Sequence, residues 1–186
     1  MAHIQVIEHH EAEGELKTIY DNLVKTRGKL AEVHKIQSLN PKSIVNHMDL
    51  YMTIMFGKSP LKRYQREMLG VVVSRANNCE YCQKHHLEAL NFYWKDDEKA
   101  EKFRNNYRSI PLNTVDTLLC DYAHHLTVNP SVDTKTKFID PLKKSGLSDR
   151  AILDANLIIS YFNFVNRMVL GLGVNLEQDG GSGYKY

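Results

Sequence analysis

The sequence predicts an all-α fold of about seven or eight helices in a single domain. Along most of the chain apolar residues recur at steps of three and four, which is typical of helices with one buried face. A capping side chain followed by proline, a signal for a helix start, occurs at residues 40–41 and again at 59–60. No run of strand length alternates apolar and polar residues. With 186 residues the chain can bury its own core, and we expect one domain at residues 1–178 and a flexible glycine-rich tail at 179–186.

The N-terminal half is expected to form four helices, each with a recognisable start or end. Gly28 follows the first, Pro41 opens the second, and Pro60 opens the third. Either Asn77 or Asn78 can cap the fourth. The predicted ranges are residues 11–24, 41–56, 60–76 and 78–94.

The C-terminal half is expected to add a polar helix, an inner helix, a kinked helix and a long core helix. Capping residues precede three of them, and Pro141 lies within the kinked one. The predicted starts are Asp96 or Asp97, Asn113, Asp133 and Ser148. The last helix, about residues 149–170, is the most apolar. Its Asn163 and Asn166 need partners if they are buried, either beside a site or at a subunit contact.

Composition and charge exclude several classes of protein. The net charge is +2 without a basic block, so nothing favours binding to nucleic acid. Charged and amide residues interrupt the core helix well short of the ~20 apolar residues that span a membrane. Residues 1–20 lack the apolar run of a signal peptide. The three cysteines do not form the pattern of a secreted disulfide framework. We therefore expect a cytoplasmic protein that binds neither membrane nor nucleic acid.

The chemistry of the chain is concentrated in the stretch from Asn77 to His86. Cys79, Cys82 and His86 are spaced by three and four residues, so a helix would carry them on one face. The positive end of the helix dipole would favour thiolate over thiol near Cys79. His85 points further round this helix and is expected to be solvated. The stretch therefore predicts an activated dithiol with an imidazole one turn away.

Two chemical roles for this stretch stay open from spacing alone. A redox dithiol would use one thiolate as attacker and the other cysteine to form an internal disulfide. A zinc site would need a fourth ligand, from Cys120 or His124, although no second ligand pair has zinc spacing. Haem attachment is excluded because Gln83, not histidine, follows the second cysteine. We otherwise expect Cys120 to be a small buried apolar residue.

A carboxylate in the preceding helix, Glu67, has a less specific signal. It lies mid-helix among apolar residues, with Arg63 and Arg66 nearby. Spacing alone favours an ion pair with one of these arginines over a catalytic role.

Together these residues resemble the motif of a known family. Glu67, Cys79, Cys82 and His86, separated by eleven, two and three residues, match the motif of the AhpD-like alkylhydroperoxidases, which belong with the carboxymuconolactone decarboxylases. The similarity is greatest to the peroxidase-related branch. It extends over nearly the whole chain, with further matches at residues 12–16, 19–20, 40–41, 51, 57, 61–67, 146–148 and 161–167.

This resemblance implies a thiol-dependent peroxidase without a cofactor or metal. Cys82 would attack the peroxide, Cys79 would resolve the product, and Glu67 would act as a base in a proton relay that includes His86. An external dithiol would reduce the enzyme. The resemblance also implies helical protomers that form homo-oligomers, commonly trimers or hexamers. A non-catalytic thiol–disulfide switch or a zinc-stapled oligomer is the alternative.

The sequence departs from the family pattern at Tyr81, where the best-studied type has a relay histidine before the second cysteine. Tyr81 and His85 are therefore possible relay members. The two lines of reasoning also disagree about the attacking cysteine, since the dipole favours Cys79 and the resemblance favours Cys82. We follow the resemblance, because His86 lies one turn from Cys82 and a neighbouring base can activate a thiol.

Overall fold

The computed structural model describes residues 2–131 and 133–177. All regular secondary structure within these residues is helical. This confirms the predicted all-α class. Nine α-helices are present in the described part of the chain: α1 Gly14–Arg27, α2 Glu32–Lys35, α3 Pro41–Tyr51, α4 Arg63–Ala76, α5 Glu80–Trp94, α6 Asp97–Asn105, α7 Thr114–Val128, α8 Asp140–Lys144 and α9 Asp149–Leu172. Two π-helical turns, Met52–Phe56 and Lys135–Ile139, and a 3₁₀ turn, Tyr107–Ser109, complete the fold. The predicted tail at 179–186 lies outside the described residues.

Several predicted helix boundaries are confirmed by their caps. The side chains of Asp96, Asn113 and Ser148 each accept a hydrogen bond from a backbone N–H in the first turn of α6, α7 and α9. Gly28 ends α1 in the left-handed conformation, at φ 91°, which glycine adopts without steric cost.

Three predicted starts are wrong by a few residues. α1 begins at Gly14, not near Glu11. α4 begins at Arg63, not at Pro60, because the Gln65 side chain accepts a hydrogen bond from the Lys62 backbone N–H and so caps the helix there. α5 begins at Glu80, and its N-cap is Cys79 itself, not Asn77 or Asn78. Asn78 adopts a left-handed backbone, at φ 55°, which turns the chain between the two helices and prevents an earlier start. The single-turn helix α2 was not predicted, since four residues give no periodic signal.

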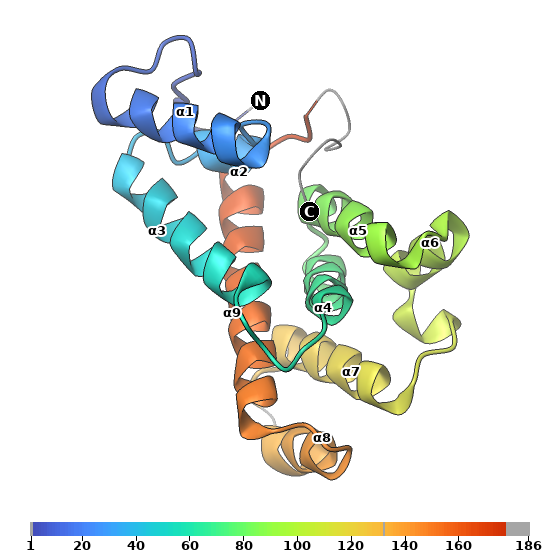
Figure 1. Cartoon of the computed structure of the whole chain (residues 1–186). Helices are drawn as coiled ribbons and strands as arrows, with labels where there is room; N and C mark the ends of the chain where they lie inside the picture. The colour runs from blue at the N-terminus through green and yellow to red at the C-terminus, as the bar shows by residue number, and fades with distance from the viewer. Residues whose placement is uncertain (1, 132, 178–186) are drawn as a thin grey trace.

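Helix α4 lies at the centre of the fold, with α5, α7 and α9 packed around it (Figure 1). Every residue from Gln65 to Ser74 is buried, which follows from contact with neighbours on several sides. Gly70 allows the Phe162 ring of α9 to approach, since a Cβ at this position would lie only 2.7 Å from that ring. The buried Arg66 donates to backbone carbonyls of Met55 and Gly57, and so fixes the chain between α3 and α4.

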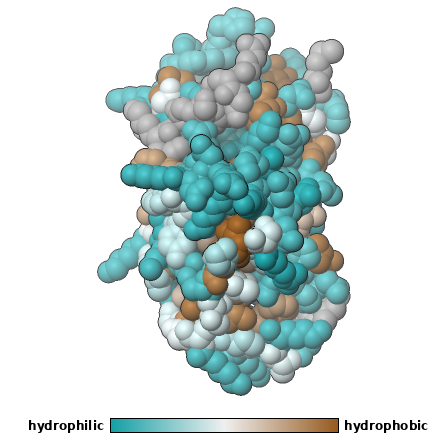
Figure 2. Space-filling view, turned by 90° about the vertical axis from the view of Figure 1, so that its right-hand side faces the viewer, coloured by the Kyte–Doolittle hydropathy of each residue, from teal (hydrophilic) through white to brown (hydrophobic). Residues whose placement is uncertain are grey.

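Helices α1 and α3 form a second, smaller apolar cluster at the N-terminal end of the molecule (Figure 1). The face that carries α5, α6 and α7 is mainly hydrophilic, with the most hydrophobic spot near its centre and smaller hydrophobic areas scattered around it (Figure 2). None of the described helices is both long enough and apolar enough to cross a lipid bilayer.

Candidate active site

The two motif cysteines lie where α4 turns into α5. Cys79 caps α5 and is fully buried, and Cys82 lies one turn further along and is 3 % exposed. Both are free thiols. Hydrogen bonding from Cys82 lowers the pKa of the Cys79 thiol, although burial opposes this. The same interaction, together with burial, raises the pKa of Cys82 well above its usual value. Cys79 is therefore the more acidic thiol of the reduced pair, and the cause is its hydrogen bond with Cys82, whereas the sequence argument rested on the helix dipole.

Glu67 and His86 form a hydrogen-bonded pair behind the cysteines. The Nδ1 of His86 lies 2.6 Å from Oε2 of Glu67, whose side chain is fully buried on α4. Arg63, one turn earlier on α4, forms an ion pair with the other carboxylate oxygen. Burial alone would raise the pKa of Glu67, but His86 and Arg63 together outweigh burial and lower it. Glu67 is therefore ionised and accepts the Nδ1–H of His86, so Nε2 is the ring nitrogen that faces away from the carboxylate.

Glu67 makes the contacts for both roles that the sequence suggested, an ion pair with an arginine and a proton relay with His86. The ion pair expected from spacing is made with Arg63, whereas Arg66 bonds to backbone carbonyls instead. The contact with His86 is the one that a proton relay requires. Phe162 supports the imidazole from the side, with the two ring centroids 4.4 Å apart and nearly perpendicular.

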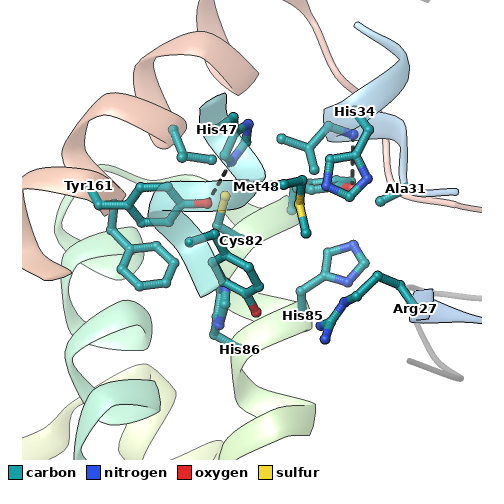
Figure 3. Close-up of a pocket in the computed structure, with 14 residues that line it drawn as sticks. Arg27, Ala31, His34, His47, Met48, Cys82, His85, His86 and Tyr161 are labelled. Atoms are coloured by element: carbon teal, nitrogen blue, oxygen red, sulfur yellow. Dashed lines mark hydrogen bonds between the residues drawn. The ribbon is translucent and has the colours of Figure 1, made fainter. Parts of the chain in front are cut away.

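Cys82 and His86 line a cavity of about 90 Å³ between α5, α9 and the N-terminal helices (Figure 3). Cys79 does not line it. Most of the lining is apolar or aromatic and includes Met48, Phe162 and Val165. A small molecule that enters this cavity therefore meets the sulfur of Cys82 and not that of Cys79.

The two possible relay residues, Tyr81 and His85, are held by a carboxylate from the far end of the chain. The Tyr81 hydroxyl donates to Oε1 of Glu177 at 2.8 Å, and Nε2 of His85 lies 2.9 Å from Oε2. Burial would raise the pKa of Glu177, but His85 and a backbone N–H outweigh it and lower the pKa to about 2. The His85 side chain is only 12 % exposed, so the expectation that it is solvated was wrong. It was wrong because the residue that covers it is distant in sequence.

Residues 46–96, which contain the whole motif, match the model of the carboxymuconolactone decarboxylase family. A peroxidase-related protein from Silicibacter sp. TM1040 shares the fold, with a TM-score of 0.83, 26 % identity, and coverage of 90 % of this chain and 87 % of that one. The segment 46–96 is therefore similar to the carboxymuconolactone decarboxylase family, and the chain shares the fold of AhpD-like, peroxidase-related proteins.

Other solved structures share the fold at lower identity. An AhpD-core, peroxidase-related protein from Ralstonia eutropha JMP134 has a TM-score of 0.86 at 20 % identity, covering 97 % of this chain and 94 % of its own. The debrominase Bmp8, solved with 2,3,4-tribromopyrrole, has a TM-score of 0.78 at 16 % identity, covering 96 % and 95 %. No curated protein sequence matches significantly. The fold of this chain is therefore one that an enzyme, the debrominase Bmp8, also has.

The two asparagines of the family-like C-terminal segment contact the turn beside the site. Asn77, just before the turn, donates to the amide oxygens of both Asn163 and Asn166, at 3.0 Å each. Asn166 in turn donates to the Ser74 hydroxyl, and it favours the thiolate form of Cys82. Asn166 is fully buried and lies beside the site, whereas Asn163 is partly exposed and also donates to Thr127 of α7.

Cys120 and His124 lie on α7 and neither lines the cavity of Cys82. Cys120 is fully buried, as predicted. In the described part of the chain, no three His, Cys, Asp or Glu side chains are arranged so that they could hold a metal ion.

Sequence reasoning missed Glu177, His47 and Tyr161, all of which contact or line the cavity. Tyr161 belongs to the segment 161–167, whose resemblance to the family was the available signal. No local pattern marks Glu177 or His47, because each reaches the site only through the folding of distant segments.

Proposed function

We propose that the protein is a thiol-dependent peroxidase in which Cys82 attacks the peroxide and Cys79 resolves the product. The observation that supports this most is the difference in access: Cys82 lines the cavity, and Cys79 is sealed behind it. Attack requires contact between sulfur and peroxide, so access outweighs the greater acidity of Cys79. That acidity suits the second step, where Cys79 itself becomes the nucleophile.

In the first step the Cys82 sulfur attacks the terminal oxygen of a hydroperoxide. The thiol proton moves to Nε2 of His86, the O–O bond breaks, and the leaving oxygen departs with the bonding electron pair and receives a proton. Cys82 becomes a sulfenic acid and the peroxide becomes an alcohol or water. The buried carboxylate of Glu67 stabilises the imidazolium that forms at His86, as a carboxylate does behind a catalytic histidine.

In the second step the Cys79 thiolate attacks the sulfenic sulfur of Cys82. The hydroxyl group leaves, takes up a proton as water, and a Cys79–Cys82 disulfide forms. The cysteines are separated by two residues at the start of a helix, so they need only a modest backbone adjustment to reach bonding distance. An external dithiol then reduces the disulfide and is itself oxidised. This cycle needs a reducing compartment, for which we propose the cytoplasm.

We further propose that the protein forms homo-oligomers through α9. Leu153, Leu157 and Phe164 lie on one side of this helix at helical spacing, and they are 53 %, 39 % and 54 % exposed. Large apolar side chains in such a stripe favour contact with another protein surface over contact with water. The described residues do not decide between a trimer and a hexamer.

The proposed function is tested by peroxide consumption with a panel of dithiol reductants. We expect wild type to consume an alkyl hydroperoxide catalytically with at least one dithiol and Cys82→Ser to lose this turnover. Cys120→Ala serves as a control that removes a buried thiol elsewhere and should retain turnover.

If the protein is oxidised once to the disulfide and turns over with none of the reductants, the peroxidase function is contradicted and a thiol–disulfide switch is supported. A brominated pyrrole, the ligand class named for Bmp8, serves as a competing substrate. Turnover with bromide release but no peroxide consumption would also contradict the proposal.

A further inference from the structure

α3 and α9 form one wall of the cavity. Along this wall runs a chain of hydrogen bonds that has no role in the proposed cycle as described so far. Gln37 Nε2 lies 2.8 Å from His47 Nδ1, and His47 Nε2 lies 2.6 Å from the Tyr161 hydroxyl. All three side chains are buried, and His47 and Tyr161 line the cavity with Cys82 (Figure 3).

The direction of each bond in this hydrogen-bond chain is fixed. Gln37 Nε2 also donates to the backbone carbonyl of Val33, so the amide cannot be reversed without placing its oxygen against that carbonyl oxygen. His47 therefore accepts at Nδ1. Burial lowers the pKa of His47 to about 4, so the ring is neutral and carries its only proton on Nε2. Nε2–H then donates to the oxygen of Tyr161.

Because Tyr161 accepts from His47, its own hydroxyl proton points away from His47. Among the described residues, no other hydrogen-bond partner of this hydroxyl is present. The hydroxyl lies on the side of the cavity where Cys82 lies (Figure 3), and a negative charge on Cys82 is among the causes that raise the pKa of Tyr161, after burial. Tyr161 thus presents a neutral O–H donor to the space in front of Cys82.

The same cavity contains another buried polar atom without a partner. Nδ1 of His34 has no hydrogen-bond partner, and the residue is only 7 % exposed. An unpaired buried nitrogen costs stability unless a ligand or water completes it. The cavity therefore offers a polar atom to its contents as well as an apolar lining.

We infer that Tyr161 donates a hydrogen bond to the leaving oxygen of the hydroperoxide while Cys82 attacks the other oxygen. This inference rests on the proposed peroxidase function and adds a catalytic residue to it. As the O–O bond breaks, negative charge develops on the leaving oxygen, and the Tyr161 O–H stabilises it until the proton from His86 completes the alcohol. His47 and Gln37 are positioning residues that aim the hydroxyl.

The test compares Tyr161→Phe with wild type for two substrates. Their leaving oxygens differ in basicity, and therefore in how much they need a hydrogen-bond donor. An alkyl hydroperoxide releases a strongly basic alkoxide, and a peracid releases a weakly basic carboxylate. The Cys82 sulfenic acid is measured in single-turnover experiments. Removing a donor of this kind costs ~10²-fold or more in rate, so we expect the ratio of alkyl hydroperoxide rate to peracid rate to fall about 10²-fold.

Two further measurements separate this role from a structural one. Tyr122→Phe removes another buried hydroxyl, which accepts from Asn156 outside the cavity, and should leave the ratio unchanged. Gln37→Leu should lower the ratio in the same direction, and nitrogen NMR of wild type should show the His47 proton on Nε2.

The outcomes are distinct. If wild type reacts and the ratio is unchanged in Tyr161→Phe and Gln37→Leu, or if His47 carries its proton on Nδ1, the assignment of Tyr161 is overturned and the peroxidase survives. If wild type is inert to both substrates, the proposed function fails and this inference fails with it.

Discussion

Replacing Glu67 with glutamine separates its two roles, because the change keeps the shape of the side chain and removes only the charge. The carboxylate is fully buried between Arg63 and His86. Removing one partner of a buried ion pair costs about 3–5 kcal/mol. Arg63 is 16 % exposed and lies 4.1 Å from the Phe56 ring centroid, which compensates part of its charge. We therefore expect a loss near the lower limit, about 3 kcal/mol, or a melting temperature lower by about 6–12 °C for a chain of this size.

The rate of Cys82 sulfenic acid formation should fall independently of this loss of stability. Without the charge of Glu67, the imidazolium that forms at His86 is no longer stabilised. A general base in such a pair contributes ~10²–10⁴ in rate. The assay is a single-turnover reaction with an alkyl hydroperoxide, at a temperature where both proteins are fully folded by circular dichroism.

The double variant Arg63→Met/Glu67→Gln provides the control. It removes the unpaired buried cation, so stability should return towards that of wild type. The rate should stay low, because His86 still lacks its carboxylate. If the rate recovers together with stability in the double variant, Glu67 acts only through the ion pair and the relay is refuted.

Three other predictions follow from the packing and the charges. Gly70→Ala should lower stability by ~1–3 kcal/mol, because its Cβ would displace the Phe162 ring, whereas Gly171→Ala, with open space around it, should be neutral or stabilising in thermal unfolding. Glu177 has a pKa of about 2 in the folded protein against 4.5 as its ordinary value. Its contribution to stability is therefore complete above pH 4.5 and is lost as the pH falls towards 2. Glu177→Gln should therefore lower stability at neutral pH and flatten its fall on the acid side in urea titrations, and a difference from wild type that persists unchanged down to pH 2 would contradict the assignment. Phe164→Arg should dissociate the oligomer in sedimentation without lowering helix content, and an unchanged sedimentation coefficient would exclude this face as the contact.

The sequence was sufficient for the helices because their caps and periodicities are local. Asn113 and Ser148 hydrogen-bond inside the first turn that follows them, so the residues that decide the boundary are neighbours in sequence. The start of α5 was missed for a different reason. The left-handed conformation of Asn78 depends on how α4 and α5 pack, and that packing is not encoded in the local pattern.

For the site, the sequence could predict which residues share a helix but not what faces them. Cys82 and His86 are one turn apart on α5, and the helix period alone places them together. The pairing of His86 with Glu67 came from the resemblance, since spacing alone favoured an arginine. Glu177 and Tyr161 reach the cavity from the other end of the chain, and only the tertiary fold shows that they do.

The measurement that tests the central claim most directly assigns the two cysteines. Wild type, Cys79→Ser and Cys82→Ser are given a brief pulse of alkyl hydroperoxide with a sulfenic-acid trap, and each cysteine is examined by mass spectrometry. If Cys82 attacks, Cys79→Ser holds a trapped sulfenic acid on Cys82, and Cys82→Ser scarcely reacts. Wild type forms a Cys79–Cys82 disulfide while the buried Cys120 stays reduced. A trapped species on Cys79 in Cys82→Ser, with none on Cys82 in Cys79→Ser, would show that acidity and not access selects the attacking thiol, and would contradict the account.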